Sequence, residues 1–195
     1  IGPLAFSSCT FSAETFVIPH KLKHIEPDAF SKGLVSFFKV ENNPHFLCSP
    51  NYQEYLCNNI GTRVLMTVNR RRFLLDIPET VVKLEPRSIR SKDITTIPGH
   101  IVEMDGAFQD VTSMSFITCM AVVPPQISDD TFNDNIFQND PTLYVPEGTA
   151  ELYRNAPGWR KFERIIDEGE YVPMQPQGLQ YNMAVNTTHE DGSQR

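Results

Sequence analysis

The chain has 195 residues, 40% of them apolar, which is enough for one folded domain or for a stretch of a longer repeat array. Its formal net charge is −7, with no basic half, and this argues against a protein that binds nucleic acid. The longest apolar run, residues 116–123, is too short to cross a bilayer. Fifteen prolines and thirteen phenylalanines favour many short strands joined by turns over long helices.

One short phrase occurs three times and begins with Ile-Pro at Ile18, Ile77 and Ile97. In each copy, apolar residues stand four and seven positions after this isoleucine, an acidic residue follows, and a further apolar residue closes the phrase. The shared apolar positions are Leu22, Val81 and Ile101, then Ile25, Leu84 and Met104, then Phe30, Ile89 and Phe108. Two copies begin 20 residues apart, and periods of 20 to 30 residues predict a solenoid whose turns stack on one another.

Each phrase predicts a short strand that ends at Ile-Pro, because proline lacks the N–H group that would continue a ladder. These strands are expected at residues 16–18, 74–77 and 95–97, with a similar strand at 37–40. After each strand we expect the chain to turn across the stack and direct its apolar positions into a shared core. The acidic residue and the Pro or Gly beside it then begin a tight turn.

Residues 41–72 interrupt the repeat and predict one inserted β-hairpin. Two apolar segments, residues 52–57 and 63–68, flank the sequence Asn-Asn-Ile-Gly-Thr, which is typical of a hairpin turn. We expect this hairpin to project from the solenoid.

Residues 116–167 predict a C-terminal capping unit. A strand over 116–123 ends at Pro-Pro, and a last strand is expected at 143–146. Thr149 is expected to cap a short helix that runs to Asn155. Trp159, Phe162 and Ile166 follow at helical spacing and would cover the open end of the stack, which otherwise leaves an apolar face in water. Residues 168–195 are predicted to be a polar tail or linker.

The ending Ile-Glu-Pro-Asp-Ala-Phe at residues 25–30, with a related copy at 1–6, resembles the BspA-like leucine-rich repeat family of bacteria. The turn Glu-Asn-Asn-Pro at 41–44 resembles that family's recurring excursion, and residues 124–162 are similar to its C-terminal cap. The resemblance covers about residues 1–167. It implies a right-handed leucine-rich-repeat-like array, export to the cell surface (anchored to the outer membrane or extracellular), and protein binding or adhesion. Because the chain begins inside a repeat phrase, we expect an upstream part to exist.

The four cysteines, Cys9, Cys48, Cys57 and Cys119, lack the Cys-x-x-Cys spacing of a zinc site. Cys9 and Cys119 are interpreted as buried thiols. Cys48 and Cys57 flank a short excursion, and their pairing in an oxidising compartment stays open. His20 and His24 have helical ligand spacing, but Pro19 and Pro27 bracket them, so no metal site is predicted.

Two surfaces are candidates for ligand binding. The first is the outward row of the strands, and the second is the hairpin, because aromatic and arginine side chains on protruding loops favour recognition. The strand row comprises Val17, Asp76, Thr96, Thr118 and Tyr144, and the hairpin contributes Tyr52, Tyr55 and Arg63.

No set of nucleophile, base and orienting group is visible in the sequence, so we expect no enzyme activity and no cofactor. The leading hypothesis is a surface-exposed, monomeric, non-catalytic module that binds a protein or glycan ligand. The alternative is a rigid structural spacer that presents another domain of a longer exported protein.

Overall fold

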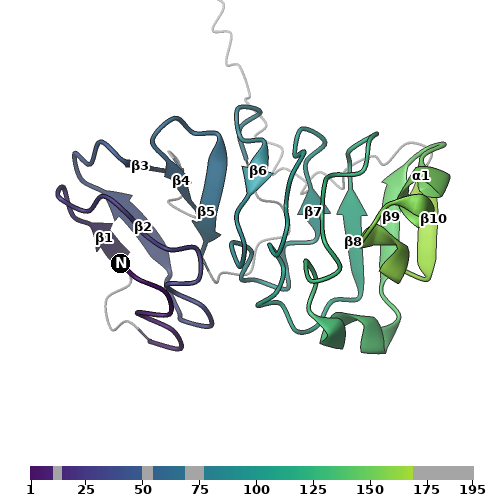
Figure 1. Ribbon diagram of the computed structural model, residues 1–195, viewed down its shortest axis with the longest axis horizontal. Coiled ribbons are helices and arrows are strands. Elements are labelled where there is room, and N and C mark those ends of the chain that lie inside the picture. The colour runs from purple at the N-terminus through teal and green to yellow at the C-terminus, as the bar shows by residue number, and fades with distance from the viewer. Residues whose placement is uncertain (11–14, 50–54, 69–76, 169–195) are drawn as a thin grey trace, which may run out of the picture.

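The computed structural model describes residues 1–10, 15–49, 55–68 and 77–168. This part of the chain is rich in strands and forms a β-solenoid of about six turns, which confirms the predicted fold class. The strands follow one another in chain order along the long axis, from β1 beside the N-terminus to β10 and helix α1 at the opposite end (Figure 1). No helix in the described ranges is long and apolar enough to span a membrane.

The C-terminal half is built on a four-stranded parallel sheet in the order β7–β8–β9–β10. Its strands are β7 (Thr96–Ile97), β8 (Phe116–Cys119), β9 (Thr142–Pro146) and β10 (Arg164–Glu168). Each strand belongs to a successive turn of the chain, and every pairing within the sheet is parallel because each turn returns in the same direction. β7 and β9 lie where the sequence predicts strands, whereas the strand expected over 116–123 ends at Cys119 and β10 was not anticipated.

The N-terminal half contains a parallel pair, β1 (Thr15–Ile18) with β2 (Phe37–Val40), both at predicted positions. A second four-stranded sheet has the order β3–β4–β5–β6. Its strands are β3 (Phe46–Cys48), β4 (Tyr55–Asn58), β5 (Arg63–Thr67) and β6 (Lys83–Leu84). Of the strand predicted over 74–77, residues 74–76 lie outside the described ranges. Ile77 belongs to no strand, and the next strand along the chain, β6, begins only at Lys83.

The repeated apolar positions form the interior, as the spacing predicts. Val81 and Ile101 are each 1% exposed, and Leu22 is half-buried against the N-terminal core. Closing residues of neighbouring turns also meet, since the rings of Phe108 and Phe132 stack with centroids 5.2 Å apart. Side chains one turn apart therefore contact each other directly, which is the defining feature of a solenoid.

The inserted hairpin is present, but the prediction that it projects from the solenoid is wrong. Strands β4 and β5 lie inside the stack, and β5 pairs in parallel with β6 of the next turn. Every residue of β4 is buried, as is every residue of β5 except Arg63. Both faces of the hairpin are apolar, so both must be covered to keep these side chains out of water.

This buried hairpin separates two cores. Tyr55, Cys57 and Val64 face the C-terminal cluster, whereas Leu56 and Met66 belong to the N-terminal cluster. The interior is thus divided at β4 and β5 and does not run without interruption through the stack.

The C-terminal unit closes the stack with three short helices: η1 (Asp134–Asn139), α1 (Ala150–Asn155) and η2 (Trp159–Lys161). Trp159 and Phe162 are buried as expected, but Ile166 is 39% exposed, because it lies in strand β10 and points to the side opposite to that of buried Ile165. The predicted cap of α1 also differs. Thr149 donates its hydroxyl to the Pro146 carbonyl, and the first helical N–H, that of Ala150, is capped by the Asp167 carboxylate at 2.8 Å.

Candidate functional site

The outward face of the β7–β10 sheet is the candidate binding site. Ile117 and Leu143 point inward and are fully buried, so the alternating side chains of β8 and β9 point away from the core. Parallel register places Phe116 beside Thr142, and Thr118 beside Tyr144. This face therefore carries rows of side chains that run across successive turns.

The predicted strand row exists, but it is less exposed than expected. Thr96, Thr118 and Tyr144 stand side by side in register. Thr96 is 8% and Thr118 only 5% exposed, and the short side chain of Thr118 lies between Thr96 and Tyr144 of the neighbouring turns. Tyr144 is half-buried. Val17 is exposed as predicted, yet it lies in β1 beside Lys39 and does not join this row.

The hairpin residues do not form the second predicted site. Tyr55 is 4% exposed and packs in the C-terminal core, because β4 lies inside the stack and not on a projecting loop. Arg63 remains at the surface, where its Nη1 donates to Glu85 Oε1 at 2.9 Å. Tyr52 and Asp76 lie outside the described residues.

Besides Tyr144 and the exposed Arg164, the outward face presents three exposed apolar residues that were not predicted to lie there. Phe116 and Met120 are each 42% exposed, and Ile166 is 39% exposed. The rings of Phe116 and Tyr144 meet edge to face with centroids 6.2 Å apart. The signal was available, because Phe116 and Met120 stand two residues before and after Thr118 and so share its face.

Two hollows lie at opposite ends of this face. One, of about 340 Å³, is at the start of β8 and is bounded by Phe116 and by polar groups such as Asp93 and Asn139. The other, of about 310 Å³, lies at the carboxyl ends of β8, β9 and β10, between Met120 and Glu168. The exposed aromatic and apolar side chains therefore lie between two hollows, one at each end of the strands.

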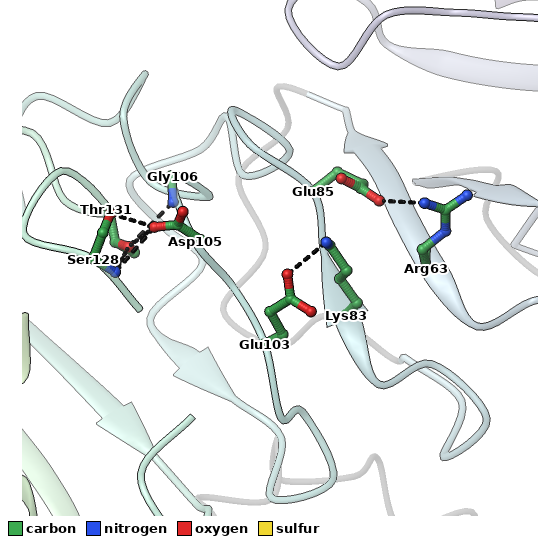
Figure 2. A network of polar contacts seen from close by, with 8 residues as sticks. All are labelled: Arg63, Lys83, Glu85, Glu103, Asp105, Gly106, Ser128 and Thr131. Carbon is green, nitrogen blue, oxygen red and sulfur yellow. Dashed lines mark hydrogen bonds and ion pairs between the residues drawn. The ribbon is translucent and has the colours of Figure 1, made fainter. Parts of the chain in front are cut away.

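A separate surface carries polar contacts between turns, which Figure 2 shows. The Lys83 ammonium donates to Glu103 Oε1 at 2.5 Å, and this hydrogen bond raises the pKa of Lys83. Asp105 accepts from the hydroxyl and backbone N–H of Ser128 in the next turn and from the Thr131 hydroxyl. These hydrogen bonds, the Ser128 hydroxyl first among them, lower the pKa of Asp105. Asp105, which stands at one of the repeated acidic positions, thus links two turns, and this role is structural.

The cysteines of the described ranges are free thiols. Burial raises the pKa of Cys119 to about 11, and burial, assisted by nearby Cys48, raises that of Cys57 to about 12, so neither is a ready nucleophile. Cys48 pairs across β3–β4 with Leu56, and Cys57 with Leu47, which directs the two thiols to opposite faces. The expectation that Cys9 is buried is wrong, since it lies exposed in a turn.

His20 and His24, which have helical spacing in the sequence, contact different partners. His20 Nδ1 lies 2.8 Å from the Asn42 carbonyl, and His24 Nε2 lies 2.8 Å from the Glu26 carboxylate. Within the described part of the chain, no group of three or more His, Cys, Asp or Glu side chains is arranged to hold a metal ion.

Neither the comparison with protein-family models nor the comparison with curated proteins finds a match for this chain.

Proposed function

We propose that this chain is a non-catalytic binding module that holds a protein or glycan ligand on the outward face of its β7–β10 sheet. One observation carries the proposal: Phe116, Met120 and Ile166 are apolar, substantially exposed and gathered on the outward face of a single sheet. Solvated sheet faces normally carry polar side chains, and exposed apolar patches of this kind mark interaction sites.

The rigidity of the sheet supports this role. The inward residues of β8 and β9 are fully buried, and parallel backbone bonds hold each strand to its neighbours, so the outward side chains start from fixed positions. A preorganised face loses little conformational entropy on binding. The hollows at both ends would let an elongated ligand lie along the strands and insert a side group at each end.

Location at a bacterial cell surface and monomeric state are part of the proposal. The resemblance of the repeat phrase to BspA-like leucine-rich repeats supports the proposed cell-surface location.

A second function, that of a rigid spacer, is favoured by the side-chain bonds between turns. Lys83 with Glu103, and Asp105 with Ser128, join neighbouring turns and resist bending of the stack. A spacer role explains these bonds but does not explain the exposed aromatic face.

The test is retention of ligands on arrays of extracellular matrix proteins and glycans. Wild-type protein is compared with the double variant Phe116→Ala/Tyr144→Ala and with Leu152→Ala, which removes an exposed apolar side chain of α1 instead. We expect the wild type and Leu152→Ala to retain the same ligand and the double variant to lose it, with all three equally folded by circular dichroism. If no ligand is retained on any array, the spacer is the better account.

A further inference from the structure

The hollow at the carboxyl ends of β8, β9 and β10 combines apolar walls with two carboxylates. Met120, Val145 and Pro146 supply the apolar surface, and Glu147 and Glu168 supply the acids. Its volume is about 310 Å³, at the lower end of the range for small-ligand pockets. The register of β10 against β9 places Glu168 directly beside Pro146, so both acids lie at the same rim.

One oxygen of the Glu168 carboxylate lacks a donor. Its Oε2 atom is buried and accepts no hydrogen bond from any residue in the described part of the chain. A covered carboxylate oxygen without a donor is costly, because it has lost water and gained no replacement. A group from outside that donates a hydrogen bond to this carboxylate would remove that cost.

Charge decides which kind of donor fits. Glu147 and Glu168 repel an anionic ligand, and the net charge of −7 attracts basic partners over a longer range. The apolar walls favour a cationic side chain over a simple metal ion, because only the side chain has apolar groups to place against them. A lysine or arginine side chain can lay its methylene groups on Met120 while its charged end reaches a carboxylate.

We propose that this hollow takes the lysine or arginine side chain of a basic protein segment. The segment would lie along the outward face, with the inserted side chain in the hollow and its neighbours over Tyr144 and Phe116. This inference depends on the proposed function and narrows its ligand from a protein or glycan to a protein that presents a basic residue.

The direct experiment is a titration of the isotope-labelled full chain, followed by nuclear magnetic resonance. The probes are acetyl-lysinamide and acetyl-argininamide, with acetyl-norleucinamide as a control that keeps an apolar side chain and lacks the charge. We expect the basic probes to shift the backbone amide signals of Met120, Glu147 and Glu168, and the norleucine probe to leave them in place. Equal shifts with all three probes would mean that the hollow recognises apolar groups only and would overturn the proposal.

Substitutions test the role of each carboxylate. Glu168→Gln and Glu147→Gln remove one charge each from the hollow, and Glu163→Gln removes one from an exposed position of the C-terminal unit outside the hollow. We expect each hollow variant to weaken the binding of acetyl-lysinamide by up to about fivefold, the upper range for an exposed ion pair. Glu163→Gln should leave it unchanged. If Glu163→Gln weakens binding as much as the hollow variants, the attraction is unspecific and the proposal falls.

Failure of this inference can be told apart from failure of the proposed function. A protein or glycan that is retained on the arrays through Phe116 and Tyr144, and retained equally by Glu168→Gln, would overturn the basic side-chain site and leave the binding module intact. Loss of array retention in Glu168→Gln, together with unchanged retention of the Glu163→Gln control, supports the site.

Discussion

Arg87 Nη1 lies 2.6 Å from Asp110 Oδ1, and this carboxylate also accepts hydrogen bonds from Ser31 and Lys32, which precede it by almost eighty residues. Residues 31 and 32 adjoin the N-terminal core, whereas Arg87 and Asp110 adjoin the C-terminal core. Asp110 is therefore a polar link between the two parts of the solenoid that the buried hairpin separates.

The first prediction concerns this link. Asp110→Ala should lower the free energy of unfolding by about 3 kcal/mol, because the side chain of Asp110 is only 3% exposed and its loss leaves several donors without a partner. Urea unfolding measures the change. Asp130→Ala, at an exposed position, should change stability by less than about 0.5 kcal/mol. Equal, small effects of the two variants would show that Asp110 does not link the cores.

The backbone of Arg87 is strained, because its φ of 58° lies in the left-handed region that favours glycine. The next turn places Gly106, with φ 67°, against it, and the Arg87 N–H bonds to the Gly106 carbonyl. Both Arg87→Gly and Arg87→Ala remove the ion pair with Asp110. We expect the glycine variant to be more stable than the alanine variant by about 1 kcal/mol in urea unfolding, since only glycine relieves the backbone strain. An alanine variant at least as stable as the glycine variant would contradict this.

The single tryptophan tests the cap. Trp159 is fully buried, and its Nε1 donates to the Pro125 carbonyl at 2.9 Å. Trp159→Phe should destabilise the protein by about 2–3 kcal/mol, because the carbonyl loses its donor and the smaller ring leaves a void. Thermal unfolding followed by circular dichroism measures this without a tryptophan signal. Tyr144→Phe, on the outward face, is the aromatic control and should be nearly neutral.

Asp105 predicts a dependence of stability on pH. Its pKa is lowered in the folded protein from the usual 3.8, chiefly by the hydrogen bond from the Ser128 hydroxyl. A lowered folded pKa means that the stabilisation is complete above pH 3.8 and is lost as the pH falls through the folded value. We therefore expect Asp105→Asn to be less stable than the wild type at pH 6, with the difference narrowing below pH 3.8. A difference that stays constant with pH would show that the charge of Asp105 is not involved.

The thiols predict a pattern of alkylation. In folded protein at pH 8, iodoacetamide should modify exposed Cys9 and leave Cys57 and Cys119 unmodified, because burial keeps their pKa values near 12 and 11. All should react in denaturant. Mass spectrometry of the digested protein identifies each site, and modification of Cys119 in the folded state would contradict its burial.

The periodic phrase was sufficient to predict stacking, because an apolar residue repeated at a constant interval can be buried only if successive turns lie on one another. Val81 and Ile101 are buried for this reason. The strands that end at Ile18 and Ile97 were equally predictable, since a proline follows each of them. The candidate face was predictable in part. Tyr144 was predicted to lie on it, whereas Phe116 and Met120 were not, although the alternation of side chains along a strand places them on the same face as Thr118.

Three-dimensional packing decided the rest. Turn signals identify a hairpin, but only the neighbouring turns determine whether it projects or enters the stack, and β4 and β5 enter it because both of their faces are apolar. The same holds for exposure on the outward face. Thr118 is buried because of what stands beside it in adjacent turns, and those neighbours, one whole repeat away along the chain, come together only when the solenoid closes.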